Sequence, residues 1–210
     1  MKKNCTEVVF VLDRSGSMCG LEKDTIGGFN SLINKQKKQD GEVLVSTVLF
    51  NDSSVVIHDR KPIDEVRLMT NKDYEVYGCT ALLDALGSSI RHIGNIHKYA
   101  RVEGVPEHTM FVIITDGMEN ASRYYSKERV KSMIEYEKEK YGWEFLFLAA
   151  NMDAIDTASQ YGIDKDHAVN YQCDSVGTRL NYEVLDEAIQ CICSGVPLSK
   201  SWKSKIEKRK

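Results

Sequence analysis

Oxygen-bearing side chains stand in three separated segments of the chain, each at the boundary of a predicted strand or helix. Asp13, Ser15 and Ser17 follow the first apolar run, Thr80 precedes a helical pattern, and Asp116 follows another apolar run. Together they supply two carboxylates and three hydroxyls. Mg²⁺ prefers such hard oxygen donors and keeps water in its coordination shell. The pattern therefore predicts a site for a hard divalent cation.

The spacing of the first segment suits this chemistry. In Asp13-x-Ser15-x-Ser17, alternate side chains can turn toward one centre as a strand becomes a loop. Gly16 allows the backbone to bend between the two serines without a Cβ clash. Because hydroxyls add no charge, only two acids would face a doubly charged ion. Such an ion can still attract an anionic ligand from outside the chain.

Strand-like apolar runs alternate with helical patterns along the chain. Strands are expected at 7–13, 43–50, 55–58, 109–115, 143–149 and 168–171, and helices at 21–38, 80–96, 126–141, 153–161 and 180–193. This order predicts a Rossmann-like α/β fold, with an open, mostly parallel sheet of about six strands and helices on both faces. The short turn at 51–54 predicts an antiparallel hairpin and one antiparallel edge strand. Ligands of such sheets bind at the carboxyl ends of strands, where the candidate residues fall.

Three segments that carry the candidate residues closely resemble von Willebrand factor type A (VWA) domains. They read VVFVLDRSGSM at 8–18, GCTALLDAL at 78–86 and IITDG at 113–117. That family has a metal-ion-dependent adhesion site of the form D-x-S-x-S, followed by a distant Thr and a distant Asp. All five positions are present in order. The resemblance covers about residues 6–195 and points to the single-domain, intracellular bacterial type.

The resemblance implies a role for each candidate residue. Ser15 and Ser17 would bind the metal directly, Thr80 directly or through water, and Asp13 and Asp116 mostly through water or as acceptors behind the ligands. The expected ion is Mg²⁺, with Mn²⁺ or Ca²⁺ as alternatives. The open coordination position would take a Glu or Asp carboxylate from a partner protein. Relatives of this type suggest an ATPase or a stress-response protein as that partner.

Several further residues are expected to form the rim of this site. They are Gly16, Cys19, Cys79, Glu119 and Asn120. Cys79 stands where the family commonly has glycine. The six cysteines include no C-x-x-C pair, so reduced thiols are expected rather than a zinc ribbon.

Two other functions compete with a non-enzymatic binding module. A Mg²⁺-dependent phosphohydrolase or phosphotransferase would use Asp13 as its nucleophile. Enzymes of that type need a second Asp two residues further on, where this chain has Ser15. A scaffold that binds partners without metal is the third reading, in which Asp13, the serines and Thr80 serve as helix caps.

Composition narrows the class of protein. The 210 residues carry a net charge of −3, but residues 198–210 contain six basic side chains and one acid. The remainder is acidic, which argues against nucleic-acid binding by the folded body. We expect a VWA domain at 1–197 and a disordered basic tail at 198–210. No apolar run is long enough to cross a membrane and no signal sequence is evident, so a cytoplasmic location is expected.

Overall fold

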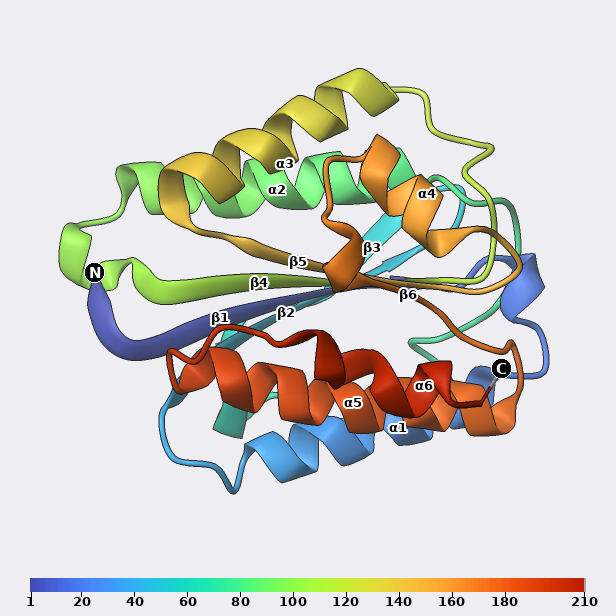
Figure 1. Cartoon of the computed structure of the whole chain (residues 1–210), viewed down its shortest axis with the longest axis horizontal. Coiled ribbons are helices and arrows are strands. Elements are labelled where there is room, and N and C mark those ends of the chain that lie inside the picture. The colour runs from blue at the N-terminus through green and yellow to red at the C-terminus, as the bar shows by residue number, and fades with distance from the viewer. Residues whose placement is uncertain (210) are drawn as a thin grey trace.

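A computed structural model of the chain describes residues 1–209 and contains one six-stranded sheet with the strand order β3-β2-β1-β4-β5-β6 (Figure 1). The strands are β1 (Lys2–Asp13), β2 (Glu42–Phe50), β3 (Ser54–Pro62), β4 (Pro106–Thr115), β5 (Glu144–Ala149) and β6 (Ala168–Asn170). The α-helices are α1 (Glu22–Gln36), α2 (Leu82–Tyr99), α3 (Lys127–Tyr141), α4 (Ala154–Gln160), α5 (Ser175–Cys193) and α6 (Ser204–Glu207). Short 3₁₀ helices are η1 (Gly16–Met18), η2 (Ile63–Glu65), η3 (Val102–Gly104), η4 (Lys165–His167) and η5 (Lys200–Lys203).

The sheet confirms the predicted fold class. β1 pairs in parallel with β2 and β4, and β4-β5-β6 continue in parallel. β3 pairs antiparallel with β2 at the edge of the sheet, as the short turn between them predicts. Helices α2, α3 and α4 cover one face, and α1, α5 and α6 cover the other. The strand order reverses between β1 and β4, and open α/β sheets commonly bind ligands at the carboxyl ends of the strands that flank such a reversal.

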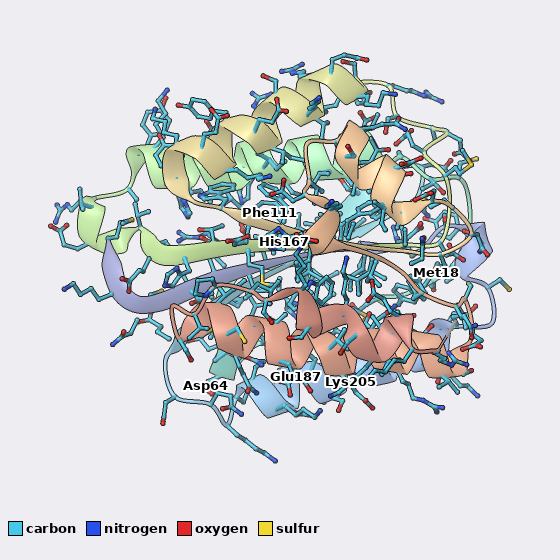
Figure 2. All side chains as sticks on the ribbon, viewed as in Figure 1. Met18, Asp64, Phe111, His167, Glu187 and Lys205 are labelled. Carbon is cyan, nitrogen blue, oxygen red and sulfur yellow. The ribbon has the colours of Figure 1, made fainter. Side chains whose placement is uncertain are left out.

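Strand β1 lies at the centre of the sheet because its apolar run suits burial on both faces. Phe10 and Leu12 pack in the cluster beneath α1 and α5, whereas Val9 and Val11 pack in the cluster beneath α2 and α3. In the second cluster Phe111 stacks on neighbouring aromatic rings between the sheet and the helices (Figure 2). Both layers therefore hold β1 in place, and its last residue has a fixed position.

The prediction of a disordered basic tail is wrong for residues 199–209. Trp202 and Ile206 are buried in the core on the α5 side, and the Trp202 indole donates a hydrogen bond to the carbonyl of Asp166 at 2.9 Å. The Lys203 ammonium donates to the carbonyls of Lys165 and Ala168, both at 2.8 Å. Two large apolar side chains among the basic residues thus anchor η5 and α6. Lys210 lies outside the described residues.

On α6, Lys205 forms an ion pair with Glu187 of α5, which adds a contact on the outer surface of this segment (Figure 2).

We expect trypsin to cut the native protein slowly after Lys203, because cleavage requires local unfolding of residues 199–209. Trp202→Ala removes the main anchor and should accelerate that cut about tenfold or more. Mass spectrometry of a digestion time course measures it. Equal rates in the two proteins would show that Trp202 does not hold the segment.

Helix termini follow local capping. Ser126 accepts a hydrogen bond from the N–H of Arg129 at the start of α3, and Asp153 caps α4 in the same way. Helix α5 begins at Ser175 rather than near residue 180, because Asp174 caps it through the N–H of Gly177 at 2.7 Å. Within the described part of the chain, no helix has the length and apolar character needed to span a membrane.

Candidate metal centre

The fold brings the five predicted residues together at the carboxyl ends of the two central strands, β1 and β4. Asp13 is the last residue of β1, and Asp116 directly follows β4, the parallel neighbour of β1. Ser15 and Ser17 lie in the loop and 3₁₀ turn after β1, and Thr80 lies two residues before α2. The hydrogen bond from the Gly16 N–H to the carbonyl of Gly78, at 3.0 Å, joins the first of these loops to the segment that carries Thr80.

Three hydroxyls converge on one small space. The Oγ atoms of Ser15 and Ser17 are 3.1 Å apart. A Cβ built on Gly117 would lie 2.7 Å from Thr80 Oγ1, 3.1 Å from Ser17 Oγ and 3.6 Å from Ser15 Oγ. The absence of a side chain at Gly117 therefore leaves a cradle open between oxygens from two loops. Its donor set of hydroxyl oxygens fits a hard cation such as Mg²⁺.

Asp116 lies behind the hydroxyls rather than in open solvent. Its Oδ1 accepts a hydrogen bond from the Ser17 hydroxyl. Its Oδ2 accepts one from the thiol of Cys173, with Sγ 3.3 Å away. A carboxylate in this position orients Ser17 and adds negative charge beside the cradle. The VWA resemblance predicts a supporting role for this carboxylate, behind the metal ligands.

Asp13 is buried and fully engaged by its neighbours. Its Oδ1 accepts a hydrogen bond from the Ser15 N–H at 2.7 Å, and its Oδ2 accepts one from the Thr115 hydroxyl at 2.6 Å. The hydroxyl of Tyr74 donates to the main-chain carbonyl of Asp13. Burial raises the pKa of Asp13, while the bonds from Thr115 and Ser15 oppose that rise. Both carboxylate oxygens thus help fix the serine loop, which suits a supporting acceptor better than a nucleophile.

Two predicted rim residues hold the loops in place. Asn120 brackets Thr80, because its side chain accepts from the Thr80 N–H at 2.9 Å and its own N–H donates to the Thr80 carbonyl at 3.0 Å. The carboxylate of Glu119 accepts from the N–H of Leu83 in the first turn of α2 and from the hydroxyl of Ser122, both at 2.8 Å. Glu119 and Asn120 therefore fix the position of Thr80 and the start of α2.

The other rim residues differ in exposure. Gly16 allows the first loop to approach the segment that carries Thr80, since a Cβ there would lie only 3.3 Å from the Gly78 carbonyl oxygen. Cys19 and Cys79 are exposed on the adjoining loops. Cys79 donates its N–H to the carboxylate of Asp52 at 3.1 Å, which fixes the backbone just before Thr80.

Sequence reasoning missed three residues that complete the centre. Thr115 and Gly117 flank Asp116, and their places beside the end of β1 follow from the β1–β4 pairing. Cys173 comes from the loop after β6, at the far edge of the sheet. No local pattern marks Cys173, because only the return of the chain toward α5 brings it to Asp116.

The six cysteines are free thiols with different surroundings. Burial raises the pKa of Cys5 and of Cys173 to about 11, and for Cys173 the bond to Asp116 adds to the rise. Thiolates are the reactive form, so iodoacetamide at pH 7.5 should label exposed Cys19 and Cys79 at least about tenfold faster than Cys173. Peptide mass spectrometry after a short pulse measures this. Labelling of Cys173 as fast as that of Cys79 would contradict its placement against Asp116.

The centre holds only two carboxylates, so it relies on hydroxyls for the remaining donors. Across residues 1–209, no group of three or more His, Cys, Asp and Glu side chains is placed to hold a metal ion. The candidate centre at the carboxyl ends of β1 and β4 differs from such a cluster, because three of its five oxygen-bearing side chains are hydroxyls.

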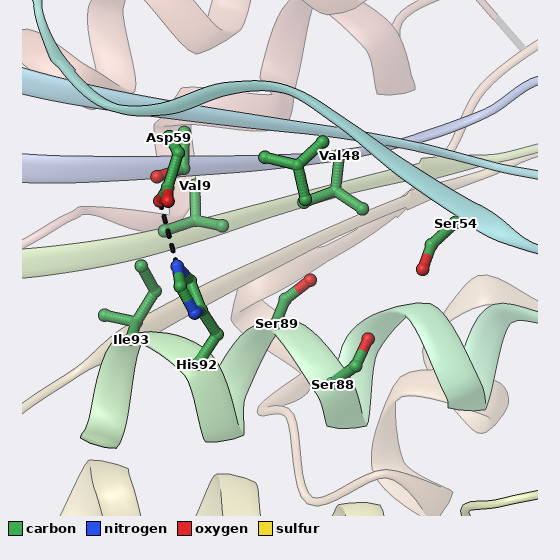
Figure 3. A pocket seen from close by; sticks show the side chains of 10 residues that line it. Val9, Val48, Ser54, Asp59, Ser88, Ser89, His92 and Ile93 are labelled. Atoms are coloured by element: carbon green, nitrogen blue, oxygen red, sulfur yellow. Dashed lines mark hydrogen bonds and ion pairs between the residues drawn. The ribbon is translucent and has the colours of Figure 1, made fainter. Parts of the chain in front are cut away.

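A separate hollow of about 520 Å³ lies between β2, β3 and helix α2 (Figure 3). Its histidine, His92, is bonded to Asp59 at 2.9 Å. The hydroxyls of Ser88 and Ser89 donate to the carbonyl of Ala85 on the same helix, at 3.0 and 2.7 Å. Both serine hydroxyls therefore donate to the helix backbone. His92 is hydrogen-bonded to the Asp59 carboxylate and not to either serine.

The fold is shared with several solved VWA structures. The vWF domain of the type V pili tip protein Mfa5 from Porphyromonas gingivalis matches 92% of this chain and 97% of its own, with a TM-score of 0.63 and 10% identity. A von Willebrand factor type A structure from Catenulispora acidiphila matches 88% of this chain, with a TM-score of 0.56 and 12% identity. The ArnB paralog VWA2 from Sulfolobus acidocaldarius also matches 88%, with a TM-score of 0.56 and 17% identity.

These likenesses establish the architecture, which is the Rossmann-like α/β fold of VWA domains. This chain spans 42% of the Catenulispora structure and 45% of the Sulfolobus structure, so it corresponds to one part of those longer chains. No protein-family model and no curated protein matches the sequence.

Proposed function

We propose that this protein is a metal-dependent protein-interaction module. A divalent cation, Mg²⁺ in the first instance, would be held by Ser15, Ser17 and Thr80, with Asp13 and Asp116 in support. When bound, such an ion supplies a Lewis-acidic position for a carboxylate oxygen of a partner protein. The observation that carries the proposal is the convergence of three hydroxyls on the space above Gly117.

The carboxylates of the site and the hydrogen bonds that fix them support partner binding rather than phosphohydrolase activity. Asp13 would be the nucleophile of a phosphohydrolase, yet both of its oxygens accept hydrogen bonds and it is almost fully buried. Ser15 stands where such an enzyme needs a second carboxylate. The rigid loop fixed by Asn120 and Glu119 presents oxygens in a set geometry, which suits recognition of a carboxylate.

Exposed apolar side chains in the loops of the centre suit a protein partner. Met118 lies two residues after Asp116 and is 70% exposed, and Tyr124 further along that loop is 79% exposed. Tyr77, three residues before Thr80, is half exposed and lies against the Arg14 guanidinium. An interface that combines one anchoring carboxylate with such side chains resembles the mixed composition of protein–protein interfaces. We infer that the partner, an ATPase or a stress-response protein among the classes considered, presents an Asp or Glu here.

Capture experiments test this function. The immobilised protein should retain a partner from a lysate of the source cells in Mg²⁺, and EDTA should reduce retention about tenfold or more. The Ser15→Ala/Ser17→Ala variant should lose the same protein, whereas Ser54→Ala, which removes an exposed hydroxyl of β3, should keep it. Replacement of the partner's contacting acid by its amide should then abolish binding. Retention that is insensitive to EDTA and to the double variant would refute the proposal.

A further inference from the structure

A second cavity lies at the opposite end of the sheet from the candidate metal centre. It has a volume of about 360 Å³ and lies where β4 begins and helices α2 and α3 end, near the N-terminus in Figure 1. Its walls include Gly94 and His97 of α2, Glu137 of α3, Val105 and Pro106 at the start of β4, and Trp143. Lys98, Glu107 and Thr109 line the cavity as well, and Glu137 is the buried carboxylate of this lining.

The carboxylate of Glu137 is buried, and one of its oxygens lacks a hydrogen-bond donor within residues 1–209. Its side chain is 9% exposed, and its Oε2 has no hydrogen-bond partner among the residues that the structure describes. Burying an unpaired carboxylate is costly, so such groups normally face a cation or several donors. Burial raises the pKa of Glu137, and the charges of His97 and Lys140 oppose that rise. A cation in the cavity would supply the missing partner.

The basic side chains around Glu137 have other contacts. Lys98, which also lines the cavity, is exposed, and its ammonium lies over the Tyr99 ring. The Nε2 of His97 is 2.6 Å from the buried Glu7, which also binds Arg60. The ammonium of Lys140 is bonded to the hydroxyl of Tyr136 and lies over the Tyr136 ring. Among the described residues, none of these three groups is hydrogen-bonded to Glu137 Oε2.

Three features of the cavity favour a positive ligand with an apolar stem. Helices α2 and α3 both end here, and the carboxyl ends of helices carry partial negative charge. Trp143, whose ring is stacked on Phe111, adds an aromatic side chain to the lining. Val105 and Pro106 offer apolar surface for a hydrocarbon chain.

We propose that this cavity binds an organic cation, an ammonium or guanidinium group on a short aliphatic stem, with Glu137 as its counter-ion. The cation would come either from a free small amine or from a Lys or Arg side chain of another protein. The site is distinct from the metal centre, so the proposal stands independently of the proposed function.

Titration of the ¹⁵N-labelled protein tests the proposal by NMR, with butylammonium, butylguanidinium and butanol as probes. The two cations should shift the indole signal of Trp143 and the amide signal of Gly94, and butanol should bind at least about tenfold more weakly. A blocked lysine tripeptide forms a further arm. Binding of the tripeptide as tight as that of butylammonium would assign the cation to a protein side chain, and weaker binding would assign it to a free amine.

Three variants make the test specific. Glu137→Gln should weaken butylammonium binding about tenfold or more, whereas Glu139→Gln, two residues away on the exposed surface of α3, should leave it unchanged. Gly94→Ala keeps the carboxylate and suits a helix, but its Cβ would lie 3.2 Å from Glu137 Oε1 and should also weaken binding. Equal binding of butanol and butylammonium, no shift at Trp143 and Gly94, or undiminished binding by folded Glu137→Gln would overturn the proposal.

Discussion

Gly117→Ala is expected to weaken divalent-cation binding strongly while the fold remains intact. The new methyl group would lie 2.7 Å from Thr80 Oγ1 and 3.1 Å from Ser17 Oγ, which is the space proposed for the ion. No ligand is removed, and the backbone of Gly117 is not in the left-handed region that disfavours alanine. We expect Mg²⁺ or Mn²⁺ affinity to fall by roughly 100-fold or more, at the upper end of what the loss of a supporting partner causes.

Isothermal titration calorimetry with both ions measures this effect. Gly27→Ala on α1 is the matched control, because a Cβ there meets no atom within 4 Å. Unchanged circular dichroism in both variants would show that they are folded. Wild-type affinity in Gly117→Ala would mean that the ion binds elsewhere and would contradict the proposed site.

Glu7→Ala is expected to lower the free energy of unfolding by roughly 3–5 kcal/mol, the usual result of breaking a buried ion pair on one side. Glu7 is fully buried on β1, and its two oxygens contact Arg60 Nε at 2.7 Å and His97 Nε2 at 2.6 Å. Its loss leaves a largely buried guanidinium without a counter-charge. That charge would lie between the central strand and the edge strand β3.

Urea unfolding at pH 7, followed by circular dichroism, gives the change in stability. Glu42→Ala provides the comparison, because Glu42 pairs with Lys2 where both side chains are more than two-fifths exposed. Surface pairs contribute about 0–1 kcal/mol, so that variant should differ little from wild type. Similar losses in the two variants would contradict the assigned role of the buried cluster.

Much of the fold follows from short-range patterns. The apolar run before Asp13 predicts a central strand, and the four-residue turn at 51–54 predicts the antiparallel edge. The tail shows where this reasoning fails. Six basic side chains dominate residues 198–210, but the burial of Trp202 and Ile206 decides their structure, and that burial depends on a surface formed by distant elements.

The candidate site likewise contains some contacts that follow from the sequence and others that do not. Convergence of Asp13 and Asp116 follows from the rule that parallel strands present their carboxyl ends at one edge. The contact between Cys173 and Asp116 joins two loops that are 57 residues apart, and no spacing in the sequence encodes it. Glu119 was expected at the rim, but the sequence did not indicate its hydrogen bond from the Leu83 N–H, which forms because the loop after β4 folds back over the start of α2.

Anomalous diffraction from crystals grown with Mn²⁺ would test the central claim most directly. The account predicts one strong anomalous peak in contact with the hydroxyls of Ser15 and Ser17 and close to Thr80, with a coordination position open to solvent. Crystals of Gly117→Ala under the same conditions should lack that peak. A wild-type map with no peak at this position, or with manganese bound only elsewhere, would contradict the account.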